Sequence, residues 1–125
     1  NKGVLSDFMV ERSALVTRQQ KSTFVRAMEK GVKIALGTDA GSPCFGSQPS
    51  AFKEMLVMQD YGMSPEQIIT SATLTSAEVL GMGEEIGAVE AGKKADLVLL
   101  GGNPYKDLNV FTEQLIQVYK SGKIV

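Results

Sequence analysis

The segment that decides the fold runs from Val32 to Pro43 and reads VKIALGTDAGSP. Its first part, Val32–Leu36, is β-branched at two positions and apolar except for Lys33, which predicts a buried strand. Its second part, Gly37–Pro43, contains glycine, serine and proline, and this composition is typical of a loop. The sequence therefore predicts a strand that ends in a loop, and this loop carries an aspartate, Asp39.

Asp39 is the strongest candidate for a functional residue. In parallel α/β sheets and barrels, the loops at the C-terminal ends of the strands build the active site. A carboxylate there can bind a cation and can also take a proton from a metal-bound water. Gly37 and Gly41 would let the backbone turn tightly around Asp39. Judged from the neighbouring residues alone, capping a turn is the commoner role of such an aspartate, so this alternative stays open.

Helices are expected on both sides of this segment. We expect Asn1–Thr17 to be a loop that leads into a helix over Arg18–Lys30, which has apolar residues at helical spacing. Gly31 supplies a left-handed stop for that helix. The apolar face of Pro49–Tyr61 predicts a second helix, which Gly62 can end.

Two capping boxes are expected further along the chain. Ser64 precedes a proline, and Gln67 follows Ser64 by three residues, so the two side chains can bind each other's backbone N–H groups. Thr75 and Glu78 repeat the spacing. The helices expected from these boxes are Pro65–Ala72 and Ser76–Leu80.

The character of the sequence changes after Gly81, where glycines separate short apolar segments. We expect strands at Ile86–Glu90, Leu97–Leu100 and Leu115–Tyr119. The stretch Lys120–Lys123 is typical of a hairpin turn, which would lead into a last strand at the C-terminus. The order is thus helix, strand, two or three helices, and a strand-rich tail.

Composition excludes several classes of function. The 125 residues carry a net charge of −1 with no basic stripe, so nucleic acid is not an expected partner. The apolar runs are only strand-sized, so no membrane span is expected. The single cysteine, Cys44, excludes an intrachain disulfide and fits a reducing cytoplasm. The chain has no histidine, the commonest metal ligand and general base. It also begins at Asn1 rather than methionine, which suggests processing or a cloned boundary.

Several motifs resemble those of one enzyme superfamily. Residues 37–43 resemble the strand-eight motif of the amidohydrolases, and the region from Ala77 to Gly122 resembles their C-terminal signature. Among the subgroups of this superfamily, the motifs are most similar to those of imidazolonepropionase-like and Xaa-Pro dipeptidase-like members. The residues that carry the C-terminal resemblance are Ala77, Leu80, Gly81, Gly87, Val89, Gly92 to Val98, Gly102 to Pro104, Asp107 and Val118 to Gly122.

The resemblance implies an α/β fold. Residues 1–82 would be the C-terminal part of a (β/α)8 barrel, with Val32–Leu36 as its last strand, and residues 83–125 would be strands of a small β-sandwich. Such enzymes hold one or two divalent metals, usually zinc, with histidines, often a carboxylated lysine, and the strand-eight aspartate. Of the family's functional residues, only the strand-eight aspartate has a counterpart in this sequence, which is Asp39. The resemblance implies that Asp39 is a metal ligand and that it also shuttles the proton from the hydrolytic water to the leaving amine. One carboxylate falls well short of the usual four ligands, so this chain alone is not expected to retain a metal.

Other candidate residues are better explained structurally. Asp96 can accept backbone donors where a strand begins, and Lys93 and Lys94 fit a solvated turn. Cys44 could act as a nucleophile only beside a base, and the chain offers no histidine for that role. The methionines Met55, Met58 and Met63 fit core filling. Relatives often carry a His-Gly pair near the position of Gln48-Pro49, so the sequence departs from the family pattern there.

Two classes of function follow from these observations. In the first, the complete parent protein hydrolyses amide, peptide or cyclic amide C–N bonds of a small-molecule or dipeptide-like substrate. In the second, the chain is a non-catalytic fragment or an assembly module derived from an amidohydrolase barrel. A third possibility is a degenerate barrel that serves assembly. A truncated barrel would leave the Val32–Leu36 edge and apolar helix faces bare, so self-association is also expected.

Overall fold

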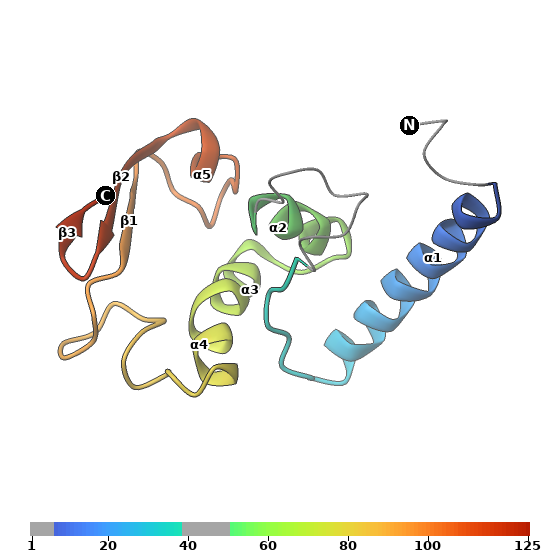
Figure 1. Ribbon diagram of the computed structural model, residues 1–125, viewed down its shortest axis with the longest axis horizontal. Coiled ribbons are helices and arrows are strands. Elements are labelled where there is room, and N and C mark those ends of the chain that lie inside the picture. The colour runs from blue at the N-terminus through green and yellow to red at the C-terminus, as the bar shows by residue number, and fades with distance from the viewer. Residues whose placement is uncertain (1–6, 39–50) are drawn as a thin grey trace. The chain divides into compact units, whose positions relative to one another are not determined.

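The computed structural model describes residues 7–38 and 51–125 (Figure 1). The chain divides into two compact units, one ending at Val32 and the other beginning at Lys33. The predicted division between residues 82 and 83 concerns the domains of a complete protein and stays a prediction. No helix within the described residues combines the length and apolar character needed to cross a membrane.

The described part of the first unit is a long helix, α1 (Asp7–Glu29). The predicted loop over Asn1–Thr17 is therefore wrong from Asp7 onward. The residues of α1 include no glycine and no proline, so nothing in that stretch interrupts a helix. Gly31 follows the end of α1 with a φ of 69°, so it stops the helix as predicted.

Three helix ends share the same glycine motif. Gly31, Gly62 and Gly81 have positive φ angles, and each N–H donates to the carbonyl three residues earlier. The N–H of the residue that follows each glycine donates to the carbonyl five residues before it. This pattern is the Schellman motif, and it satisfies carbonyls that a helix end leaves without partners.

The second unit begins with residues 33–38, which form neither helix nor strand, and the next described element is α2 (Ala51–Asp60). The predicted strand at Val32–Leu36 is not observed, because a parallel strand needs neighbouring strands and the described residues offer this segment none. The apolar face of α2 buries Met55 and Met58, and Met63 beyond its end is also buried. These three methionines fill the core as predicted.

A continuous helical stretch follows, and it contains a π-turn. It consists of α3 (Pro65–Thr70), the π-helical η1 (Ser71–Thr75) and α4 (Ser76–Val79). The predicted capping box at Ser64 is confirmed: the Ser64 N–H donates to Gln67 Oε1 at 2.9 Å and the Gln67 N–H donates to Ser64 Oγ at 3.2 Å. The second box is wrong, because Thr75 has helical angles and caps nothing with its side chain.

The tail forms a small antiparallel sheet. Its strands are β1 (Leu97–Leu100), β2 (Leu115–Lys120) and β3 (Lys123–Ile124), in the order β1-β2-β3. Leu97 pairs with Tyr119, and Tyr119 pairs with Ile124 on its other side. Both central residues of the β2–β3 turn, Ser121 and Gly122, have positive φ, as tight hairpin turns require. The two strands and the hairpin predicted here are confirmed.

A short helix that the sequence did not predict, α5 (Val110–Glu113), lies between β1 and β2 along the chain. Its Val110 is buried, as is Leu108 just before it. The remaining predicted strand, Ile86–Glu90, is wrong. Residues 86–88 form a bend around Gly87, whose φ is 94°. A residue with that backbone angle cannot continue a regular strand.

Gly87 packs directly against the helical stretch 65–79. A Cβ at this position would lie 2.7 Å from Ala77 Cβ and 3.0 Å from Leu74 Cα. Gly92 has the same φ of 94°, but a Cβ there would meet nothing within 4 Å. Gly92 therefore requires glycine only for its backbone angle, whereas Gly87 requires it both for its backbone angle and because no Cβ would fit there.

We expect Gly87→Ala to destabilise the chain more than Gly92→Ala. Both variants carry the strain of a left-handed backbone, roughly 1–2 kcal/mol, and only Gly87→Ala adds a clash, which costs about 1–3 kcal/mol more. Urea unfolding of both variants and the wild type gives the difference. Equal losses of unfolding free energy would mean that the close approach to Ala77 has no energetic weight.

Candidate functional site

The residue predicted to carry the chemistry, Asp39, lies outside the described residues, as does Cys44. The structure does describe the backbone that leads to Asp39, up to Thr38, and the helix α2 that follows the loop. The described segments on either side of these residues are 33–38 and α2.

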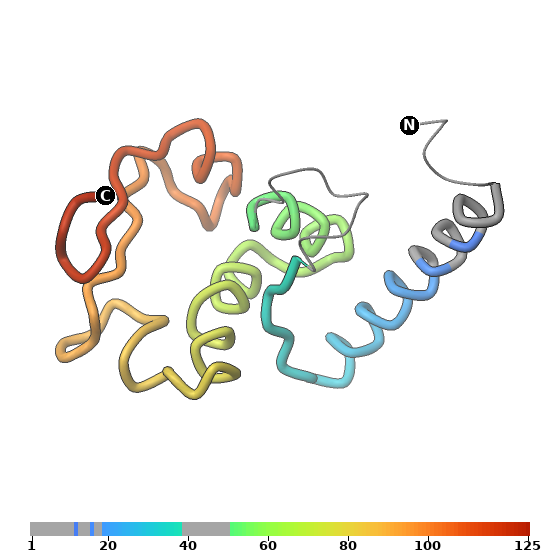
Figure 2. The backbone as a smooth tube through the Cα atoms, in the orientation of Figure 1, coloured from blue at the N-terminus to red at the C-terminus, as the bar shows by residue number. Residues whose placement is uncertain are grey.

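Ser71 holds the segment that leads to Asp39. Its side chain is buried, and its hydroxyl donates a 2.7 Å hydrogen bond to the carbonyl of Ile34. Its own carbonyl accepts the N–H of Leu36 at 3.3 Å. Residues 33–38 consequently run beside the helical stretch 65–79 (Figure 2). Ser71 could not be predicted from the sequence, because only its contacts with Ile34 and Leu36, far away in the sequence, distinguish it from other helix serines.

A second contact joins the same two segments. Lys33 Nζ lies 2.8 Å from Glu78 Oε2, and the two side chains are 76% and 41% exposed. Ion pairs exposed to this degree contribute little to stability. The buried contacts of Ser71 are therefore the stronger restraint on residues 33–38.

Glu54 is the titratable group of interest on the other side of the loop. It lies in the first turn of α2 and is half-buried. Burial raises the pKa of its carboxyl group above the ordinary value. Groups with such shifts gather at functional sites, although structural burial has the same effect. Glu54 was not predicted from the sequence as a functional residue.

The described residues do not fit a metal centre. Residues 7–38 and 51–125 contain no group of three or more histidine, cysteine, aspartate or glutamate side chains that could hold an ion. The full sequence has no histidine and one cysteine.

The glycine- and lysine-rich segment 92–96 binds the loop that follows α4. Lys93 Nζ donates to the carbonyl of Gly83 at 2.6 Å and lies 3.3 Å from Glu90 Oε2. Its side chain is only 12% exposed, so the prediction of a solvated turn is wrong for Lys93. Lys94 Nζ lies 2.5 Å from Glu85 Oε2. The contact raises the pKa of Lys94 and lowers that of Glu85.

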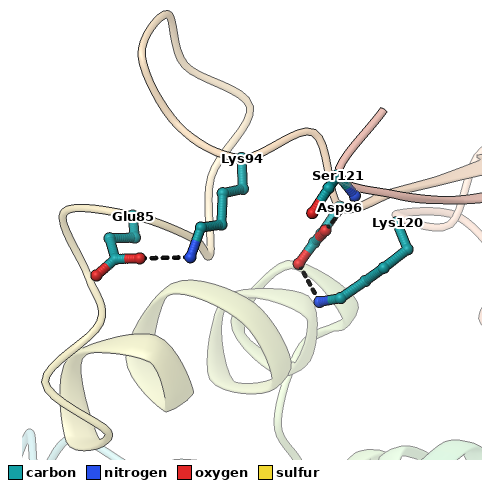
Figure 3. A network of polar contacts seen from close by, with 5 residues as sticks. All are labelled: Glu85, Lys94, Asp96, Lys120 and Ser121. Carbon is teal, nitrogen blue, oxygen red and sulfur yellow. Dashed lines mark hydrogen bonds and ion pairs between the residues drawn. The ribbon is translucent and has the colours of Figure 1, made fainter. Parts of the chain in front are cut away.

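Asp96 binds the β2–β3 turn at the other end of the same segment (Figure 3). Its Oδ1 accepts the N–H of Ser121 at 2.8 Å, and its Oδ2 accepts Lys120 Nζ at 2.5 Å. The N–H of Gly122 donates to the carbonyl of Ala95 at 2.9 Å. The predicted role of Asp96, accepting a backbone donor where a strand begins, is confirmed. We call residues 92–96 with these partners the clasp.

Comparison with known proteins identifies the class. The sequence profile described as the amidohydrolase family matches residues 1–125. The chain therefore belongs to the amidohydrolase family, which confirms the resemblance drawn from the motifs.

The individual relatives agree with both suggested subgroups. An imidazolonepropionase of Shouchella clausii (strain KSM-K16) is 37% identical over 103 residues, which cover 80% of this chain and 23% of the relative. One from Clostridium tetani (strain Massachusetts / E88) is 38% identical over 112 residues, covering 84% of this chain and 26% of the relative. The crystal structure of a Xaa-Pro dipeptidase with bound methionine in the active site has a TM-score of 0.79 and 40% identity, and the match covers 92% of this chain and 27% of that one. The chain thus spans about a quarter of the length of these curated relatives.

The clasp predicts a pH dependence of stability. The hydrogen bond from Lys120 and then the one from the Ser121 N–H hold the pKa of Asp96 below its ordinary value of 3.8. The ionised form is favoured in the folded chain, so its contribution is complete above the unfolded pKa and is lost as the pH falls through the folded pKa. We expect the wild type to be more stable than Asp96→Asn at about pH 7, and the difference to shrink below about pH 4.

Urea unfolding at several pH values measures this difference. Glu84→Gln removes another carboxylate charge, from an exposed residue, and controls for the change in net charge. A difference between wild type and Asp96→Asn that does not change with pH would mean that ionisation of Asp96 does not stabilise the hairpin.

Proposed function

We propose that this chain is the C-terminal portion of a hydrolase that cleaves C–N bonds. The observation that carries the proposal is the match of the amidohydrolase profile to the whole chain. Relatives named as imidazolonepropionase and Xaa-Pro dipeptidase support a cyclic amide or a dipeptide-like compound as the substrate class. The activity is proposed for the complete protein and not for this chain alone, because the chain covers only 23% to 27% of the length of these relatives.

The proposed architecture of the complete protein is a (β/α)8 barrel beside a small β-sandwich. Residues 1–82 would belong to the barrel, with segment 33–38 including part of its last strand. Residues 83–125 would belong to the sandwich. Two features support this assignment. Residues 33–38 form neither helix nor strand and have no strand partners among the described residues. The sheet β1-β2-β3 also leaves Val98, Ile116 and Ile124 exposed, as expected of a sheet that other strands cover.

Asp39 is the residue to which we assign the chemistry. In the complete protein its carboxylate would be one ligand of a divalent metal, zinc in our proposal, and the other ligands would come from outside this chain. When bound, such a metal supplies Lewis-acid polarisation of the scissile carbonyl. The Asp39 carboxylate would accept a proton from the hydrolytic water and pass it to the leaving amine. Asp39 follows residues 33–38, which Ser71 contacts through the Ile34 carbonyl and the Leu36 N–H.

Replacement of Asp39 tests the proposal in the complete protein. Asp39→Asn keeps the size of the side chain and removes its charge and its basicity. We expect kcat/KM for amide or dipeptide hydrolysis to fall by at least about 10²–10⁴-fold, the usual share of acid–base catalysis, with little change in unfolding temperature. Asp107→Asn is the matched control, because Asp107 is exposed and its Oδ1 only accepts bonds from Asn109. Full activity in Asp39→Asn would remove Asp39 from the mechanism.

The second candidate function is a non-catalytic assembly module, and exposed apolar surface favours it. On β1, β2 and β3, the side chains of Val98, Leu99, Leu115, Ile116 and Ile124 are exposed. Exposed apolar side chains on a small sheet favour association with another apolar surface. We therefore expect the purified 125-residue chain to self-associate.

Light scattering coupled to size exclusion measures the association. Ile116→Thr and Ile124→Thr together should shift the chain toward the monomer, because they reduce the exposed apolar area while keeping β-branched residues. Val79→Thr, at an exposed position of α4, is the control. A wild-type chain that stays monomeric at high micromolar concentration would rule out self-association as a property of this chain.

A further inference from the structure

The loop between α4 and β1 is closed at its base by bonds between its two ends. The Lys94 N–H donates to the carbonyl of Glu85 at 2.8 Å, and the Lys94 amine lies 2.5 Å from the Glu85 carboxylate (Figure 3). Beside this pair, Lys93 Nζ donates to the carbonyl of Gly83 at 2.6 Å. Compact surface loops with neighbouring ends, about 6–16 residues long, frequently serve a function. We call residues 83–94 the closed loop.

Lys93 is the more buried of the two lysines that close this loop. Its side chain is 12% exposed, whereas that of Lys94 is 49% exposed. A buried amine needs polar partners to offset the loss of water, and Lys93 has the Gly83 carbonyl and, at 3.3 Å, the Glu90 carboxylate. An ion pair as exposed as that of Lys94 contributes little to stability. The Lys93 amine is therefore the side chain on which the closure depends most.

The closed loop packs against the end of the helical stretch 65–79. A Cβ on Gly87 would lie 2.7 Å from Ala77 Cβ, and a Cβ on Gly83 would lie 3.5 Å from Glu78 Cγ. Just before the loop, the N–H of Met82 donates to the carbonyl of Ala77 at 2.8 Å. Both the start and the middle of the loop are thus in contact with α4.

The residues that leave the closed loop bind the sheet. Asp96 accepts the Ser121 N–H and the Lys120 amine, and the Gly122 N–H donates to the carbonyl of Ala95 at 2.9 Å. These bonds hold the two residues after the loop against the β2–β3 turn (Figure 3). A continuous series of packed and hydrogen-bonded groups therefore runs from α4 through the closed loop to the hairpin.

We propose that the closed loop couples the sheet β1-β2-β3 to the helical stretch 65–79, and that the Lys93 amine keeps the loop closed. While the base is closed, the sheet separates from the helices only if the loop opens as well. In the proposed architecture the loop begins where the barrel portion meets the sandwich portion, so it would hold these two portions together, a consequence that rests on that proposal. The coupling itself does not depend on the chemistry assigned to Asp39.

Hydrogen exchange in the complete protein tests the coupling. Lys93→Met keeps a long side chain and removes the amine. We expect exchange to become at least about tenfold faster over 97–100 and 115–120 as well as in the closed loop, because a hydrogen bond from a charged group is lost. Residues 65–70 should keep their wild-type rates. Lys93→Arg retains a donor and should restore most of the protection, and Lys106→Met, at an exposed lysine, should leave the sheet unchanged.

The distant strands provide the decisive measurement. Unchanged exchange in Lys93→Met, or a change confined to residues 83–94, would make Lys93 a local contact and overturn the coupling. Should Lys93→Met not fold, the urea dependence of exchange in the wild type decides. The Lys94 N–H, inside the loop, and the Gly122 N–H, at the hairpin, should show the same free energy of opening. Clearly different values would mean that loop and sheet open independently. Each result leaves the proposed hydrolysis to be tested separately by Asp39→Asn.

Discussion

The hydrogen bond from the buried Ser71 side chain to the Ile34 carbonyl joins two segments that are 37 residues apart. A buried polar group without a partner costs about 1–3 kcal/mol, so each side of this bond depends on the other. Among the described residues, no buried side-chain nitrogen or oxygen lacks a partner. On another side of the same helical stretch, Gly87 approaches so closely that no side chain would fit. The stretch 65–79 is thus held by polar contacts to the segment before the loop and by close packing to the bend that follows it.

Local signals predicted the parts of the fold that depend on local contacts. The Ser64 box, the glycine stops and the β2–β3 hairpin each satisfy their backbone groups within a few residues, so the sequence is sufficient to indicate them. The Thr75 box has the same residue spacing, yet the helix continues through Thr75 because the π-turn and the contacts of Ser71 favour a continuous helical stretch. A capping signal therefore predicts a helix start only where no tertiary contact stabilises the helix that precedes it.

The strand and the site were less accessible to prediction for a related reason. The composition of Val32–Leu36 favours a strand, but a strand is completed by neighbours, and the described residues provide none for it. Asp39 could be singled out by its place after that segment and by the family motif, whereas the histidine ligands that the resemblance implies have no counterpart in the sequence. Ser71 gave no signal, because serine is common in helices and only its distant partners give it a role.

The clasp shows why the lysines and the aspartate of the C-terminal signature are structural. Lys93 buries most of its side chain to reach a backbone carbonyl, and Asp96 uses one oxygen for a backbone N–H and the other for Lys120. A carboxylate with both oxygens engaged and a lowered pKa is a poor proton acceptor, because its basicity has been reduced by the bonds that hold it. General bases work best with a pKa near the operating pH, which is the opposite shift. The signature therefore connects the sheet to the turn after α4, and our proposal assigns the proton transfer to Asp39 instead.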